Sequence, residues 1–303
     1  MGSPLELTDR DVELLATLLK YRYLSTPQAQ RLHFPSTQTA LRRLRRLSAS
    51  GYVTTFKSPA CPERIVTLTR AGAEMVADRL IGPSDDIGWA GRRQQPKDYL
   101  FLQHFLAVSD FRITLTQACA NDHDIDLLGF IPEYRARSSA SEPARRYVQD
   151  VVTNASDHDR KITHSPDGVF ALTHGGRSAL FFLEIDRGTE VLSNPAKGFL
   201  KMVRFYLAYL RDGGYQRYKR DFGIEALFRG FRTLVVTTSP ARLRNMREAC
   251  GQLSFTPNGA KRFIWLATAE AVRDPAILTR SLVSCDPADE TRYSILPEKP
   301  STA

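Results

Sequence analysis

The stretch TQTALRRLRRLSASG at residues 37–51, followed by YVTTFKSPACPERIVTLTRAGAEM at residues 52–75, decides the fold of the first part of the chain. Three leucines of the first segment recur at the spacing of one helical face: Leu41, Leu44 and Leu47. Ser36 and Gly51 are residue types that begin and end helices. We therefore expect a helix over residues 37–50.

The residues after this helix change to short β-rich runs. Residues 52–56 and 65–68 predict the two strands of a hairpin, and Thr69 is placed to cap a helix over residues 70–80. Upstream, apolar periodicity predicts helices over residues 9–19 and 26–32. The order helix, helix, helix, hairpin, helix describes a winged helix-turn-helix domain over residues 1–81.

Charge is distributed unevenly in this domain. Residues 14–62 contain eight Lys and Arg and no Asp or Glu, within a chain whose net charge is +9. The side of the 37–50 helix opposite its leucines carries Gln38, Thr39, Arg42, Arg45 and Arg46. In a helix-turn-helix this outward face enters the major groove of duplex DNA, where Gln pairs with adenine and Arg with guanine or phosphate. Lys57 and Arg64 flank the expected hairpin and complete the predicted DNA-binding set.

The alternative interpretation is that RRLRR is simply a solvated helix face. The absence of any balancing acid, on the third helix of this order, favours nucleic-acid binding. Duplex DNA is favoured over RNA, because a projecting helix fits the major groove of B-form DNA and not the narrow one of A-form RNA.

The rest of the chain predicts a second domain. We expect a linker over residues 82–98, an α/β domain over residues 99–285 with the order αβββαβ, and a flexible tail over residues 286–303. The 303 residues suffice for two domains, and 42 % hydrophobic with 25 % charged residues is typical of soluble globular proteins. The expected fold class is α+β. Because no membrane span or signal peptide is evident, we expect a cytoplasmic protein.

Two carboxylate-bearing segments fall where that order brings strands together. Asp167 leads the apolar strand in HSPDGVFAL, and Glu184 and Asp186 alternate in FFLEIDRGTE, so the last two project to one side. Carboxylates at the polar end of neighbouring strands suit a hard divalent ion such as Mg²⁺, which can activate water for phosphodiester chemistry. The opposite hypothesis is that PDG is a strand-entry turn and that the acids, with Arg187, form a structural ion-pair network.

A basic stretch near the middle of the second domain is interleaved with aromatic residues: Tyr215, Tyr218, Phe222, Phe228 and Phe231. Such a stretch is able to track a DNA backbone or stack unpaired bases. A partner-protein surface or an ordinary loop over the core is an equally good interpretation. No Walker loop or GxGxxG segment is present, so nucleotide hydrolysis is not expected.

The Pro-Asp pair, the following strand with Glu, and the αβββαβ order resemble the PD-(D/E)xK nuclease-like superfamily. Together with a winged helix in front, His104, PDGVF, FFLEIDRGTE and the helix bearing Lys197 and Lys201 are similar to the replication-relaxation proteins of plasmids and integrative conjugative elements. The resemblance implies Asp167 and Glu184 as metal ligands for Mg or Mn. The sequence departs from the nuclease pattern at the lysine position, which Asp186 occupies, so Lys201 or Lys197 would have to replace that lysine from the next helix.

From this resemblance we expect a sequence-specific duplex DNA-binding protein in replication, mobilisation or control of a mobile element, with a degenerate nuclease-like domain. One alternative is a metal-dependent DNA nickase or endonuclease that uses Asp167, Glu184, Asp186 and Lys201. Another is a transcription regulator whose second domain binds a partner or signal, or pairs two copies into a homodimer.

Overall fold

The computed structural model of the chain describes residues 5–59, 61–81, 99–133, 149–154, 160–194, 196–253, 261–273, 275–278 and 281–296. Contacts divide these residues into two compact units, which meet in sequence between Ile113 and Thr114. Each unit combines helices with its own β-sheet, so the chain has a mixed α and β fold. The expected linker at residues 82–98 lies outside the described residues.

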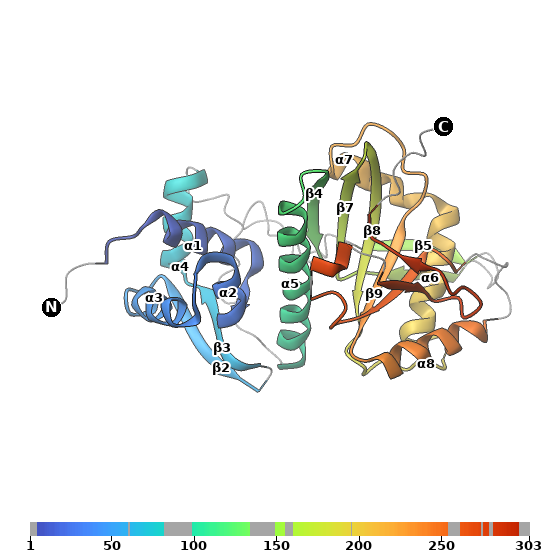
Figure 1. Cartoon of the computed structure of the whole chain (residues 1–303), viewed down its shortest axis with the longest axis horizontal. Coiled ribbons are helices and arrows are strands. Elements are labelled where there is room, and N and C mark those ends of the chain that lie inside the picture. The colour runs from blue at the N-terminus through green and yellow to red at the C-terminus, as the bar shows by residue number, and fades with distance from the viewer. Residues whose placement is uncertain are drawn as a thin grey trace. The chain divides into compact units, whose positions relative to one another are not determined.

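The first unit contains helices and strands at the places that the sequence predicts, with one strand more (Figure 1). Its elements are α1 (Asp9–Tyr21), β1 (Tyr23–Ser25), α2 (Thr26–His33), α3 (Thr37–Ala49), β2 (Val53–Ser58), β3 (Cys61–Leu68), α4 (Arg70–Val76) and the π-helix η1 (Ala77–Ile81). The three strands form an antiparallel sheet in the order β1-β3-β2. The unpredicted strand β1 therefore ties the segment before α2 to the hairpin.

The core of this unit lies between its helices and its sheet. Leu44 and Leu47 of α3 are buried together with Leu15 and Leu18 of α1, and Val66 of β3 joins the same cluster. This confirms the apolar stripe expected on α3, although Leu41 is only half-buried. Burial of this stripe fixes which side of α3 is left to solvent.

Residues 68–72, with the sequence LTRAG, lie where α3, β3 and α4 meet, and the contacts there require these residue types. Thr69 caps α4 by accepting a hydrogen bond from the Gly72 amide at 3.1 Å, and its hydroxyl donates to the Tyr52 carbonyl at 2.9 Å. A Cβ atom on Gly72 would overlap the same Tyr52 carbonyl oxygen. Glycine is therefore required here for close approach of two backbone segments.

The division between the units falls inside α5 (Tyr99–Ala120), whereas we expected a boundary before Tyr99. Leu106 is buried in the first unit, and its carbonyl accepts a 2.8 Å hydrogen bond from the Gln28 side chain of α2. Arg31 of α2 adds a 3.2 Å ion pair with Asp110. These contacts between α2 and α5 explain why the first half of α5 packs with the first unit.

The second unit is built on a seven-stranded mixed sheet with the strand order β12-β11-β10-β9-β8-β7-β4. Its strands in this sheet are β4 (Ile125–Pro132), β7 (Gly168–His174), β8 (Arg177–Ile185), β9 (Arg232–Thr237), β10 (Ile264–Thr268), β11 (Leu282–Ser284) and β12 (Arg292–Tyr293). Strands β4, β7 and β8 form an antiparallel meander, and β8, β9 and β10 are parallel. Apart from β5 and β6, which lie between β4 and β7 in the chain and form a sheet of their own, α5, β4, β7, β8, a helix and β9 follow one another in the expected order.

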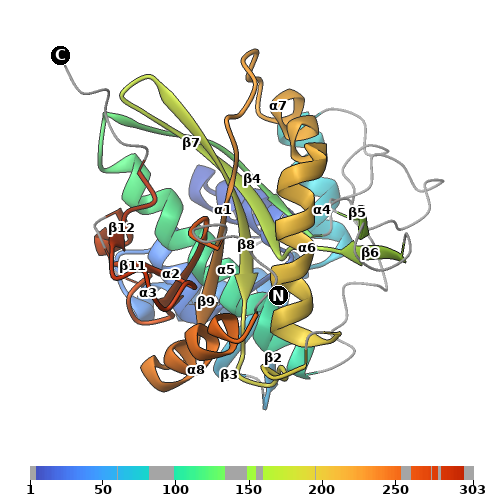
Figure 2. The same cartoon turned by 90° about the vertical axis from the view of Figure 1, so that its right-hand side faces the viewer.

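Two helices, α6 (Gly198–Asp212) and α8 (Pro240–Gly251), cover one face of this sheet (Figure 2). Phe182 of β8 packs there against Tyr206 and Tyr209 of α6. A separate hairpin of β5 (Asp150–Asn154) and β6 (Arg160–His164) contacts α6. The connection to β9 carries the short helices η4 (Gly214–Arg217) and α7 (Tyr218–Asp221). The sequence pattern did not predict this hairpin.

The expected flexible tail is not what the structure shows for residues 286–296. Asp289 and Ile295 are buried, and β12 pairs with β11. Arg247 of α8 donates to the carbonyl of Asp289 at 2.7 Å. These contacts order the segment because it supplies both a sheet edge and acceptors for a helix side chain. Residues 297–303 lie outside the described residues.

Replacing Gly72 by Ala should destabilise the first unit by about 1–3 kcal/mol, because the new methyl group overlaps a backbone oxygen that cannot move independently. Chemical denaturation of the full chain measures this loss. Gly230→Ala is the matched control, since a Cβ there lies 3.8 Å from its nearest neighbour. Equal stability of the two variants would contradict the proposed close approach.

Candidate functional site

Helix α3 presents a basic face to solvent. Its N-cap Ser36 accepts a hydrogen bond from the Thr39 amide at 3.3 Å, which sets the start of the helix where the sequence predicts it. Four of the five predicted side chains on this face are exposed: Gln38, Arg42, Arg45 and Arg46. Thr39 is half-buried, and its hydroxyl lies 3.0 Å from that of Ser36. Thr39 therefore contributes mainly to the N-cap of α3.

Arg43 is the arginine of this helix that does not face solvent. Its Nε donates to Asp11 Oδ1 of α1 at 2.7 Å, and its Nη2 contacts Asp11 Oδ2 and the Glu6 carbonyl. Asp11 is 1 % exposed and also accepts hydrogen bonds from the backbone and hydroxyl of Thr8. The pair joins α3 to α1 and fixes the rotation of α3 about its axis.

The same ion pair lowers the pKa of Asp11. Burial by itself opposes ionisation of Asp11, but hydrogen bonds from Arg43 and Thr8 outweigh it and lower the pKa of the carboxyl group. Asp11 is thus held as a carboxylate. Its charge neutralises Arg43 alone, so the positive charge of the exposed α3 face is left uncompensated by this acid.

The hairpin adds two cations to the site. Lys57 near the end of β2 and Arg64 on β3 are exposed, as the sequence predicts for side chains that flank a wing. Arg64 lines the same pocket as Arg45 of α3. The structure thus brings the predicted hairpin and helix residues to one surface of the first unit.

The basic and aromatic stretch of the second unit is a core element. The rings of Tyr215, Tyr218 and Phe231 are buried, and Phe231 packs edge-on against Phe182 of β8 at 4.9 Å between centroids. Phe222 and Phe228 are buried as well. Rings that build the core cannot stack on bases, so the loop-over-the-core interpretation holds for these aromatic residues.

Asp167 and Glu184 lie close together beside the meander. Asp167 accepts a 2.6 Å hydrogen bond from the amide of Ile185, the residue after Glu184, and its own amide donates to the Leu183 carbonyl. Glu184 accepts hydrogen bonds from the Tyr206 hydroxyl at 2.5 Å and is paired with His164 at 2.6 Å. The hairpin and α6 therefore both anchor on this glutamate.

Asp186 has its own partners on the same sheet face. Arg242 of α8 binds it through two hydrogen bonds, Nη2 to Oδ1 at 3.0 Å and Nε to Oδ2 at 3.1 Å. The hydroxyl of Thr237 donates to Oδ2 at 2.6 Å. From the sequence, Asp186 was a candidate catalytic residue or, with Arg187, part of a structural ion-pair network of the acids, and Arg242, which is 56 residues away, was not predicted.

The donor set for a divalent ion is incomplete in the described structure. Within the described ranges, no group of three or more His, Cys, Asp and Glu side chains could hold a metal ion. One oxygen of Glu184 already receives Tyr206 and His164. Lys201, expected to replace the missing nuclease lysine, is exposed on α6. The Mg or Mn site that the resemblance implies stays a prediction, and we derive no reaction step from a metal.

His164 and Glu184 form a half-buried ion pair. Burial lowers the pKa of His164, but the Glu184 carboxylate, by its charge and hydrogen bond, outweighs burial and raises that pKa above its ordinary value. Burial raises the pKa of Glu184, and His164 opposes this shift without cancelling it. The imidazole also lies against the Phe205 and Tyr206 rings.

The family model described as replication-relaxation matches residues 15–223, which is more than half of the chain. The curated proteins and the solved structures that were compared contain no significant match. Among the described residues, none of the helices combines the length and apolar character needed to cross a membrane.

Replacing Asp11 by Asn should lower the free energy of opening of α1 and α3 by about 3 kcal/mol at neutral pH. Removing one partner of a buried pair leaves the charge of the other partner uncompensated. Because the pKa of Asp11 is lowered in the folded chain, its stabilisation is present above the ordinary value of 3.8 and is lost as the pH falls through the folded-state value. Hydrogen exchange at α1 and α3 measures both effects. Asp9→Asn, at an exposed residue in the same turn, is the control; if it loosens α3 equally, the pair does not hold the helix.

Replacing His164 by Gln should destabilise the second unit by about 3 kcal/mol near pH 6. The pKa of His164 is raised on folding, so its stabilisation is complete below the ordinary value of 6.5 and is lost as the pH rises through the folded-state value. The difference between wild type and variant in denaturant unfolding should therefore shrink in alkaline buffer. The exposed His123 gives the control variant His123→Gln. A difference that does not change with pH would mean that a neutral imidazole makes this contact.

Proposed function

The chain belongs to the replication-relaxation family, and from this we propose that its first unit is a winged helix-turn-helix domain that binds duplex DNA through α3. The observation that carries the proposal is the exposed face of α3, where Gln38, Arg42, Arg45 and Arg46 lie beside Lys57 and Arg64 of the hairpin. The order of three helices, a hairpin and a helix, with β1 completing the sheet, supports the winged-helix assignment.

Electrostatics supports a polyanionic partner for this face. Residues 14–62 contain no acid, and the nearby Asp11 is already paired with Arg43. Three exposed cations from α3 and two from the hairpin region would otherwise repel one another, and a phosphate backbone relieves that repulsion while releasing counterions.

The side chains on α3 suit two kinds of contact. Gln38 lies in the first turn, the part of a recognition helix that reaches base edges, and a Gln amide pairs with adenine. Arg42 follows one turn later and is able to bind a guanine edge with its planar fork. Arg46 lies another turn on, where a guanidinium meets phosphate. We infer sequence-specific binding from this combination.

We further infer that the chain acts in the replication, mobilisation or control of a plasmid or other mobile element. The second unit has the αβββαβ order of the PD-(D/E)xK nuclease-like superfamily, and we assign it as a degenerate member. Its three acids have structural partners: Asp167 binds a backbone amide, Glu184 binds His164 and Tyr206, and Asp186 binds Arg242. These contacts support a framework role for the carboxylates.

An active nickase that uses Mg²⁺ or Mn²⁺ is the second candidate, because Asp167, just before β7, lies close to Glu184 on β8. A transcription regulator with the same DNA-binding unit, acting as a homodimer or through another partner, is a third. Both share the first unit's proposed function and differ in what the second unit does.

The double variant Arg42→Ala/Arg46→Ala should weaken duplex binding and flatten its salt dependence by about one unit of the log–log slope, because the phosphate contact of Arg46 contributes about 0.9. Fluorescence anisotropy with the full chain over a range of salt concentrations measures both quantities. Arg70→Ala/Arg79→Ala removes the same charge from exposed residues of α4 and η1 and is the control. An unchanged slope in the first variant would remove α3 from the interface.

If the second unit is degenerate, Mn²⁺ should neither raise the melting temperature of the full chain nor support nicking of supercoiled DNA. Asp167→Ala should then lower stability through loss of the Ile185 contact and leave the response to metal unchanged. Stabilisation by Mn²⁺ in wild type that disappears in Asp167→Ala would establish the metal site, because a ligand that binds only the native state stabilises it by mass action.

A further inference from the structure

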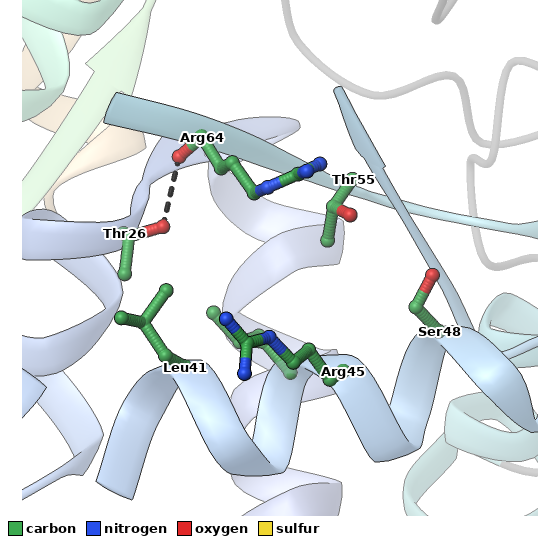
Figure 3. A pocket seen from close by; sticks show the side chains of 7 residues that line it. Thr26, Leu41, Arg45, Ser48, Thr55 and Arg64 are labelled. Carbon is green, nitrogen blue, oxygen red and sulfur yellow. Dashed lines mark hydrogen bonds between the residues drawn. The ribbon is translucent and has the colours of Figure 1, made fainter. Parts of the chain in front are cut away.

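The surface between α3 and the hairpin is hollowed into a pocket of about 200 Å³ (Figure 3). Arg45 and Ser48 reach it from α3, Thr55 from β2 and Arg64 from β3. In Figure 3 the two guanidinium groups extend over the hollow from opposite sides. The space is that of about six or seven water molecules at about 30 Å³ each, which suits a phosphate group of five heavy atoms.

We propose that this pocket holds one backbone phosphate of duplex DNA, bound by Arg45 and Arg64 together. This inference rests on the proposed function and deepens it, because it separates the α3 residues that position the chain on DNA from those that distinguish its sequence. Arg45 and Arg64 position the protein, and Gln38 and Arg42 contact base edges.

The charges in the pocket call for an anion. In the part of the chain that the structure describes, neither the Arg45 nor the Arg64 guanidinium has an acidic partner. Two like charges that line one small space repel each other, and an anion between them turns that repulsion into two attractions. Planar guanidinium forks match the oxygens of phosphate and bind them through charge-assisted hydrogen bonds.

The remaining lining adds donors and fixes the shape. The hydroxyls of Ser48 and Thr55 have no hydrogen-bond partner among the described residues, so both are available to phosphate oxygens. Leu41 and Leu44 supply an apolar lining, which strengthens charge interactions nearby by excluding water. The hydroxyl groups can donate hydrogen bonds to a phosphate in this pocket. A nucleobase edge would find no polar partner on the leucine side of the pocket.

The backbone under Arg64 is held in place before any ligand binds. Thr26 at the start of α2 donates its hydroxyl hydrogen to the Arg64 carbonyl at 2.9 Å, as Figure 3 shows. The next residue, Ile65, pairs with Ser25 of β1 and is fully buried. Strand β1 and Thr26 of α2 therefore fix the position of the Arg64 backbone relative to α3, so fewer groups have to become ordered when DNA binds.

The test uses the full chain and a duplex that wild type selects from a random pool. Single phosphates along this duplex are replaced, one at a time, by neutral methylphosphonates. In wild type, one replacement should weaken binding about tenfold, the scale of a lost charge-assisted contact. Arg45→Ala/Arg64→Ala should be insensitive at that position and as sensitive as wild type elsewhere, and Arg70→Ala/Arg79→Ala should match wild type throughout. A double variant with the wild-type profile would overturn the proposal.

A second measurement separates failure of the pocket from failure of the proposed function. Both arginines are exposed, and circular dichroism checks that the double variant is folded. If wild type binds no duplex, the proposed function fails, and inorganic phosphate then tests the pocket by itself. Saturable NMR shifts of the Arg45 and Arg64 Nε–H signals would support an anion site, whereas unmoved signals would overturn it.

Discussion

The ion pair between Asp11 and Arg43 is the interaction on which the first unit depends. It joins the first turn of α1 to the middle of α3, and Asp11 is the buried partner. With Leu44 and Leu47 packed on one side, the pair leaves α3 only one rotation, in which Arg42, Arg45 and Arg46 face solvent. One acid thus serves a structural arginine and leaves the others to a ligand, so packing of the core and display of charge follow from the same contact.

The second unit shows the same use of charge for a different purpose. Glu184 connects β8 to the β5–β6 hairpin through His164 and to α6 through Tyr206, while Asp186 connects the end of β8 to α8 through Arg242. Removing such polar groups from water is costly unless every one is paired, and here each has a partner of opposite charge or a hydroxyl donor. These contacts hold the helices and the hairpin on the sheet.

Sequence patterns predicted the features of the fold that depend on residues close together in the chain. Periodicity and capping within one helix explain the stripe of Leu44 and Leu47 and the caps at Ser36 and Thr69. The order of helices and strands follows from such patterns taken one after another along the chain. The pair of Asp11 with Arg43 spans 32 residues, and that of Glu184 with His164 spans 20. No periodic signal records such contacts, because tertiary packing selects the partner.

Two other differences have similar causes. Strand β1 is too short to show alternation and exists because β3 offers it an edge. The polar segment after Asp286 looked flexible, yet Arg247 and β11 supply partners that its composition does not reveal. For the site, exposure of the basic residues on α3 was predictable from the helical face, whereas the partners of the three acids were not.

We propose that duplex DNA binds the first unit across α3 and the hairpin. Chemical-shift mapping of backbone amides in the full chain, on addition of a short duplex, tests it most directly. We expect the largest shifts to fall in α3 and in β2 and β3, and to weaken as salt is added. Shifts confined to the second unit, or none at a concentration of duplex that saturates binding, would contradict it.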